Sequence, residues 1–164
     1  MLAARRLVLL TVATWVAGCA SRPERLPAGS DGLPAPMPSE AARDAAVFAV
    51  SLIGVPYRNG GTSPDSGFDC SGLVWYVYRQ AAGLALPRSA VEMERAGWPV
   101  EQNEIQPGDL VFYNTLGRAF SHVGIYVGER RFVHAPSSGG KVEIVSMQNT
   151  YWARRFSGAR RIAA

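Results

Sequence analysis

The spacing of hydrophobic residues changes near the middle of the chain. Before residue 97, apolar side chains recur three and four positions apart, which is the period of one face of an α-helix. This period predicts three helices, over residues 40–53, 70–82 and 89–96. Residues with capping or helix-ending chemistry stand at their ends, namely Ser39, Gly54, Pro56, Gly83, Ser89, Glu92 and Gly97. The stretch 57–69, rich in Gly, Pro, Ser and Asn, is expected to be a loop.

From residue 109 onward the pattern is typical of β-strands. Short segments rich in β-branched and aromatic residues alternate with turns, at 109–113, 122–127, 131–135 and 142–145. Residues 128–130 are expected to close a hairpin, and a last strand is expected over 156–162. Helices followed by a run of strands predict an α+β domain in which N-terminal helices pack on a central antiparallel sheet.

Residues 1–18 have the layout of a secretory signal. Arg5 and Arg6 precede an apolar stretch over 7–17 that ends in small residues and is too short to span a bilayer. The sequence Val-Ala-Gly-Cys at 16–19 resembles the bacterial lipobox, which implies cleavage before Cys19 and attachment of lipid to that cysteine. The alternatives are an uncleaved anchor and an ordinary secretory signal with an incidental cysteine.

Residues 19–38 are interpreted as a tether after the lipidated cysteine. The segment contains five prolines and too little apolar material to fold. At about 3.3 Å per residue it could extend roughly 60 Å, which would hold a domain away from a membrane surface. The remaining residues, 39–164, suit one domain with a single core.

Charge argues against a nucleic-acid-binding protein. The formal net charge is +4, and it falls to +2 when Arg5 and Arg6 leave with the signal. Four arginines lie near the C-terminus, at 154, 155, 160 and 161. They are expected to form a solvated face or tail, with contact to an anionic polymer as the alternative.

Cysteine usage draws attention to Cys70. An exported protein normally pairs its thiols, yet this chain has only Cys19 and Cys70. With Cys19 lipidated, Cys70 has no disulfide partner. Its place at the start of a predicted helix, near free N–H groups and the positive end of the helix dipole, is expected to lower its pKa and favour the thiolate. Its spacing to Leu73 and Val74 leaves a buried, inert cysteine open as the alternative.

The chain has only two histidines, His122 and His134. They lie on the two strands of the predicted hairpin, where positions on one face come side by side. One imidazole could then act as general base toward Cys70 while the other orients it. Taken singly, each could be a satisfied polar residue of a strand. A two-histidine metal site is also conceivable, but no further Asp, Glu or Cys has ligand spacing near them, so no metal is expected.

Five short motifs resemble those of the NlpC-type family of cell-wall cysteine peptidases. They are Asp-Cys-Ser-Gly-Leu at 69–73, Leu-Pro-Arg at 86–88, Pro-Gly-Asp-Leu at 107–110, Ser-His-Val-Gly-Ile-Tyr at 121–126 and Phe-Val-His-Ala at 132–135. The match runs from about residue 42 to 162. The resemblance implies a papain-like α+β fold with Cys70 as nucleophile, His122 as base and His134 as the third polar residue, and it requires no cofactor.

The resemblance also gives roles to residues around the nucleophile. Tyr57 matches a family tyrosine whose hydroxyl reaches the active site and could hold an oxyanion with the Cys70 N–H, or it could be a packed loop aromatic. Asp69 and Ser71 are candidates to line the substrate groove, although either could only cap the helix. Arg88 could belong to the groove or to the scaffold.

The resemblance implies an endopeptidase that acts on peptidoglycan stem peptides through an acyl-enzyme. The bond would be the D,D cross-link to diaminopimelate or the bond after γ-D-glutamate, and small lipid-anchored relatives favour the cross-link. An amidase or acyltransferase with the same triad, and a catalytically silent wall-binding or scaffolding lipoprotein, remain alternatives. We expect a monomer held on a membrane through Cys19. Ala20 is compatible with the outer membrane of a Gram-negative cell, facing the periplasm.

Overall fold

The computed structural model describes residues 35–137 and 139–163. The predicted signal, Cys19 and most of the tether therefore lie outside the described residues. Among the helices of the described part, none is long and apolar enough to cross a membrane.

The three expected helices are present, and polar side chains cap each of them. They are α1 at Glu40–Ser51, α2 at Cys70–Ala81 and α3 at Ala90–Arg95. The side chains of Ser39, Asp69 and Ser89 accept hydrogen bonds from the backbone N–H groups of the first turns. At the other end of α2, Ala82 is the C-cap, and Gly83 follows it with a φ of +66° that favours glycine.

The expected strands and one further short strand, β3, form one antiparallel sheet with order β3-β8-β4-β5-β6-β7. Their bounds are β3 Trp98–Val100, β4 Leu110–Tyr113, β5 His122–Gly128, β6 Arg131–His134, β7 Glu143–Ser146 and β8 Phe156–Arg161. Sequence periodicity missed β3, the small hairpin of β1 (Thr62–Ser63) and β2 (Gly67–Phe68), and helix α4 (Thr150–Ala153). Each of these elements has only two to four residues, which is too few to show a period.

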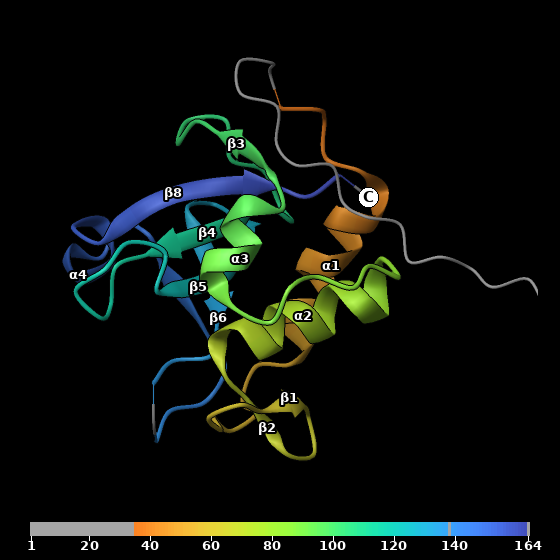
Figure 1. Cartoon of the computed structure of the whole chain (residues 1–164), viewed down its shortest axis with the longest axis vertical. Coiled ribbons are helices and arrows are strands. Elements are labelled where there is room, and N and C mark those ends of the chain that lie inside the picture. The colour runs from red at the N-terminus through yellow and green to blue at the C-terminus, as the bar shows by residue number, and fades with distance from the viewer. Residues whose placement is uncertain (1–34, 138, 164) are drawn as a thin grey trace, which may run out of the picture.

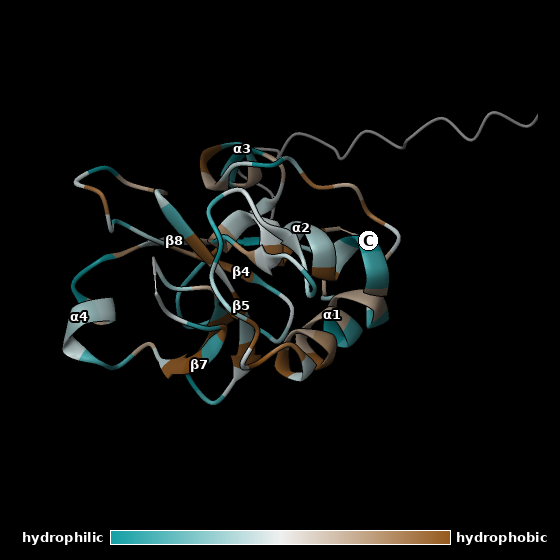
Figure 2. Ribbon diagram, turned by 90° about the horizontal axis from the view of Figure 1, so that it is seen from below, coloured by the Kyte–Doolittle hydropathy of each residue, from teal (hydrophilic) through white to brown (hydrophobic). Residues whose placement is uncertain are grey.

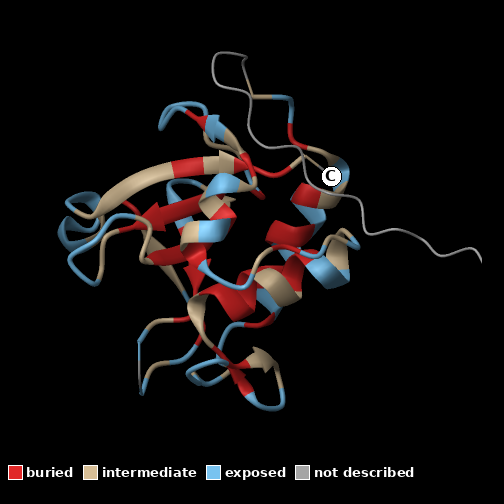
Figure 3. Ribbon diagram, viewed as in Figure 1, coloured by how far each residue is buried: buried red, intermediate tan, exposed pale blue. Residues whose placement is uncertain are grey.

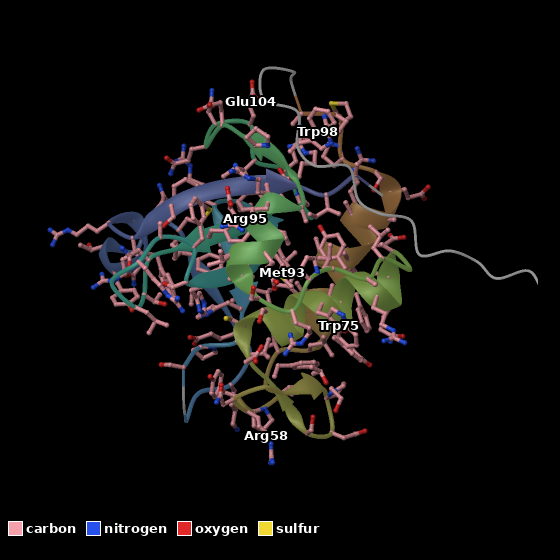
Figure 4. All side chains as sticks on the ribbon, viewed as in Figure 1. Arg58, Trp75, Met93, Arg95, Trp98 and Glu104 are labelled. Atoms are coloured by element: carbon pink, nitrogen blue, oxygen red, sulfur yellow. The ribbon has the colours of Figure 1, made fainter. Side chains whose placement is uncertain are left out.

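The helices cover one face of the sheet, so the domain has two layers (Figure 1). Seen from the direction of Figure 2, α1 and α2 lie beside β4 and β5, and α4 lies at the opposite end of the molecule from α1. The faces of α1 and α2 toward the sheet are buried, as are all of β4 and the first four residues of β5 (Figure 3). Met93 of α3 is fully buried and completes this layer (Figure 4).

Alternation along β4 divides the core into two clusters. Leu110 and Phe112 point toward the helices, whereas Val111 and Tyr113 point to the other face. The second face is strongly aromatic, because Tyr113 packs against Phe132 and Trp152 with ring centroids 4.7 and 4.9 Å apart. The predicted α+β architecture is therefore confirmed, with a separate aromatic cluster on the sheet face away from the helices.

The C-terminal arginines do not form a solvated tail, so that prediction was wrong for two of the four. Arg161 is only 4% exposed and bonds the fully buried Asp109. Arg160 forms an ion pair with Glu94. The strand β8 carries both arginines into the sheet, and a buried guanidinium there requires an anionic partner. Arg154 is exposed, as expected.

Candidate active site

Cys70 is the first residue of α2, and the loop before it is fixed by close backbone contact. Asp69 caps the helix through Oδ1, which accepts from the N–H of Gly72 at 2.6 Å. A Cβ on Gly72 would lie 1.9 Å from the carbonyl oxygen of Gly61, so only glycine fits there. The first turn of α2 therefore packs directly on the loop at 60–61. This contact fixes the position of the Cys70 sulfur.

The thiol of Cys70 is half-buried and free, and it lies against the beginning of β5. Burial raises the pKa of Cys70, and the charge of Asp69 raises it further, although backbone hydrogen bonds from Val123, Ser71 and Cys70 itself act in the opposite direction. The bond from Val123 places the sulfur next to the residue that follows His122. The predicted low thiol pKa is therefore wrong for the resting protein, because burial outweighs the helix N-terminus.

The two histidines form a hydrogen-bonded pair. Nε2 of His122 lies 2.9 Å from Nδ1 of His134, and the two rings are nearly perpendicular, at 81°. The geometry predicted from the hairpin is thus confirmed. Because Nε2 of His122 is engaged with His134, Nδ1 is the nitrogen of His122 that remains for Cys70.

Aromatic rings enclose the histidine pair. Trp152 of α4 stacks on His122 with centroids 5.5 Å apart and meets the edge of His134 at 4.8 Å. Burial lowers the pKa of His122 to about 4. It lowers the pKa of His134 to about 3, with the charge of His122 as a further cause. Both imidazoles are therefore neutral at pH 7, and the resting dyad is a thiol beside a neutral base.

Tyr57 lies in the neighbourhood of Cys70. Its ring packs against the core beside Cys70, and its backbone N–H donates to the carbonyl of Gly140 at 2.9 Å. Burial raises the pKa of the Tyr57 hydroxyl, and the charges of Asp69 and Cys70 raise it further. A neutral hydroxyl on the same side of the core as Cys70 can donate a hydrogen bond, which is compatible with the predicted oxyanion role.

Asp69, Ser71 and Arg88 form one network beside Cys70. Oδ2 of Asp69 accepts from the N–H of Gly60 at 2.9 Å, and Nη2 of Arg88 lies 3.4 Å from the same oxygen. The Ser71 hydroxyl lies 2.7 Å from the carbonyl oxygen of Arg88, to which it donates. Asp69 and Ser71 therefore hold Arg88 in place beside Cys70. The Arg88 side chain is 39% exposed, and its remaining N–H groups are free to donate hydrogen bonds. Substrate binding by these three residues stays a prediction.

Two hollows flank the dyad. A groove of about 370 Å³ runs over Cys70 and is lined also by Ser71, Arg88, Ser89, Ala90, Val91, Arg118, Phe120 and Ser121. A second hollow of about 240 Å³ adjoins the histidines and is lined by Thr115, Leu116, His122, His134, Pro136, Ser137, Glu143, Tyr151 and Trp152. A substrate in the first groove therefore meets two cationic side chains, Arg88 and Arg118.

Sequence reasoning missed Arg118, Glu143 and Trp152. Arg118 and Trp152 lie in segments with no periodic pattern. Glu143 lies on a strand that the sequence predicted, but pairing of that strand with β6 was needed to place it opposite His134. Within residues 35–137 and 139–163, no group of three or more His, Cys, Asp or Glu side chains is arranged to hold a metal ion.

Comparison with known proteins identifies the family of this chain. The chain belongs to the NlpC/P60 family, whose model matches residues 54–161. It is 48% identical over 113 residues to the murein DD-endopeptidase MepH of Escherichia coli, covering 67% of this chain and 42% of MepH. It is 47% identical over 114 residues to the gamma-DL-glutamyl hydrolase of Bacillus subtilis, covering 69% of this chain and 27% of the relative. The chain thus spans less than half of the length of these two curated relatives.

The fold agrees with solved structures as well. A lipoprotein-like NLP/P60 family protein from Staphylococcus aureus superposes with a TM-score of 0.68 at 34% identity, covering 82% of this chain and 45% of that one. The family resemblance and the papain-like α+β fold predicted from the sequence are therefore confirmed.

Proposed function

We propose that this protein is a cysteine endopeptidase that cuts the stem peptides of peptidoglycan. The observation that carries the proposal is the His122–His134 hydrogen bond of 2.9 Å beside a free cysteine that lines an open groove. A binding module has no need for two buried, neutral imidazoles next to a thiol. The constellation instead meets the requirements of nucleophilic catalysis.

The proposed mechanism begins with a neutral thiol and a neutral imidazole. Nδ1 of His122 takes the proton of Cys70 as the sulfur attacks a stem-peptide carbonyl, and the carbon–sulfur bond forms. The oxyanion is held by the Cys70 N–H and the hydroxyl of Tyr57. His122 returns the proton to the leaving amine, and water then hydrolyses the acyl-enzyme. His134 holds His122 in position throughout.

We propose the D,D cross-link to diaminopimelate as the bond that is cut, with the γ-D-glutamyl bond as the second candidate. The name of the E. coli relative supports the first bond, and the name of the B. subtilis relative supports the second. Both substrates carry free carboxylates near the reacting carbonyl. Arg88 and Arg118 in the groove over Cys70 supply the complementary charge.

The experiment is digestion of isolated peptidoglycan by the purified full chain in detergent, followed by mass spectrometry of the fragments. We expect new muropeptides from the parent and none from Cys70→Ala. The control is Glu101→Ala, which changes an exposed side chain that does not line the groove and should cut like the parent. Equal cutting by Cys70→Ala and the parent would contradict the nucleophile assignment, and the product masses identify the bond.

We also propose that lipid on Cys19 anchors the protein to the outer membrane, facing the periplasm. The lipobox-like Val-Ala-Gly-Cys, the residue Ala20 and the proline-rich segment after it support this. In cells fed an alkyne analogue of palmitate, the parent should carry the label and sediment with the outer membrane. The Cys19→Ala variant should do neither. Label or membrane association that survives in this variant would contradict the anchor.

A further inference from the structure

The buried side of the histidine pair is the feature that the mechanism above leaves unexplained. His134 is fully buried, and Nδ1 is its contact to His122. Its other ring nitrogen, Nε2, has no hydrogen bond of good geometry within the described residues. A buried imidazole nitrogen without a partner is costly, so a group close to it has a large influence on where the proton lies.

A charged group, the carboxylate of Glu143, lies near that nitrogen. Its Oε1 lies 3.5 Å from Nε2 of His134. The contact follows from the fold, because β6 and β7 pair His134 directly with Glu143. The glutamate side chain is 53% exposed, so the carboxylate reaches the buried imidazole from solvent, at the edge of the hollow beside the histidines.

The position of one proton decides whether His122 can act as a base. Each neutral imidazole carries one N–H, and the bond between the rings uses either the N–H of His122 or that of His134. If His122 donates through Nε2, its Nδ1 has a free lone pair for Cys70, and His134 carries its proton on Nε2. If His134 donates through Nδ1, His122 carries its proton on Nδ1 and cannot accept another.

We propose that Glu143 is a positioning residue that selects the productive tautomer of the histidine pair. Its carboxylate attracts a proton on Nε2 of His134, which frees Nδ1 of His134 to accept from His122. In the opposite arrangement, a bare lone pair of His134 would face the carboxylate. Glu143 therefore acts on the nucleophile through two imidazoles and touches neither substrate nor sulfur. The kinetic test of this inference rests on the proposed function, whereas the spectroscopic test does not.

The first test reads the tautomers directly. The chain has only two histidines, so histidine-labelled full chain without a histidine tag gives two assignable imidazoles in long-range ¹H–¹⁵N spectra. We expect the proton of His134 on Nε2 in the parent and a shift toward Nδ1 in Glu143→Ala. A parent spectrum with the proton on Nδ1, or a spectrum unchanged in Glu143→Ala, would overturn the inference.

The second test separates positioning from structure by kinetics. Glu143→Ala should lower kcat on the order of tenfold or more with KM nearly unchanged, because only the base is affected. Glu143→Gln keeps an oxygen acceptor and should restore most of the rate. Glu101→Ala, an exposed acid on another part of the surface, is the matched control and should leave kcat unchanged. Equal loss in the Ala and Gln variants overturns tautomer selection.

The two proposals fail in different ways. If Cys70→Ala abolishes hydrolysis while Glu143→Ala cuts at the parent rate, the role of Glu143 is wrong and the proposed function stands. If the parent does not cut peptidoglycan, the proposed function is wrong, and the tautomer spectra still decide the role of Glu143.

Discussion

The guanidinium of Arg161 meets the carboxylate of Asp109 through two parallel hydrogen bonds, from Nε to Oδ1 at 2.8 Å and from Nη2 to Oδ2 at 2.7 Å. The pair joins β8 to the turn before β4, and Arg161 also donates to the carbonyls of Pro36 and Glu104. Next to it, the hydroxyl of Tyr78 bonds the carbonyl of Gly108, so α2 is tied to the same turn. The turn at 107–109 thereby connects the helical layer to the sheet.

Removing the guanidinium should destabilise the fold strongly. Arg161→Ala leaves Asp109 buried without its counter-charge, which costs about 3–5 kcal/mol in the free energy of unfolding. Urea denaturation followed by circular dichroism measures this. Arg154→Ala, at an exposed arginine, should stay within about 0.5 kcal/mol of the parent. Similar midpoints for the two variants would show that the buried pair contributes little.

Cys70 should react slowly with an alkylating agent at neutral pH. Its pKa is raised above the ordinary thiol value by burial, so the thiolate is scarce until the solution becomes alkaline. The rate of iodoacetamide labelling, followed by mass spectrometry of the peptide that holds Cys70, should rise through a midpoint more alkaline than that of an ordinary exposed thiol. A midpoint below pH 7 would instead indicate a thiolate–imidazolium pair in the resting protein.

The acid limb of the pH–activity profile should lie unusually low for a histidine base. The base must be neutral to act, and neutral imidazole is the form present above its pKa. Because burial lowers the pKa of His122 to about 4, kcat/KM should persist below pH 6 and fall as the pH approaches 4. Circular dichroism at each pH controls for acid unfolding. Half-maximal activity at pH 6.5 or above, with the fold intact, is the contrary result.

Trp152 should control the position of that limb. Trp152→Ala opens the histidine pair to water, weakens the burial that disfavours the charged form, and should raise the pKa of His122 by about one unit. The acid limb of kcat/KM should then move to higher pH. Trp75→Ala is the control, since Trp75 lies on α2 (Figure 4), where its ring pairs with the guanidinium of Arg79 and with neither histidine. If the acid limb of kcat/KM stays at the same pH in Trp152→Ala, the Trp152 ring is not what lowers the pKa of His122.

Gly72 should tolerate no side chain. In Gly72→Ala the new Cβ meets the carbonyl of Gly61, so the start of α2 must shift, at a cost of about 1–3 kcal/mol in the free energy of unfolding. Cys70 moves with it, and kcat should fall by at least about tenfold. Gly54→Ala, where a Cβ meets nothing within 4 Å, should lose stability through its φ of +96° but keep kcat. Parent-like kcat in Gly72→Ala would mean that this contact does not position the sulfur.

Several parts of the fold and site could be predicted because they depend on local pattern. The hairpin spacing placed His122 beside His134, and Asp69 was recognised as a possible cap of the helix that begins at Cys70. What failed depended on distant partners. The burial of Arg161 requires Asp109, which lies 52 residues earlier, and the enclosure of His122 requires Trp152 from a four-residue helix. The pKa of Cys70 was predicted in the wrong direction because burial by β5 outweighs the local helix effect.

The proposed nucleophile and the proposed base belong to different layers of the domain. Cys70 is carried by α2, and His122 begins β5, so the sulfur and the imidazole keep their relation only while the helices stay docked on the sheet. The proposed activity therefore depends on the packing of the helical layer against the sheet. Strain on the contact between α2 and β5 should lower the proposed activity before the domain unfolds.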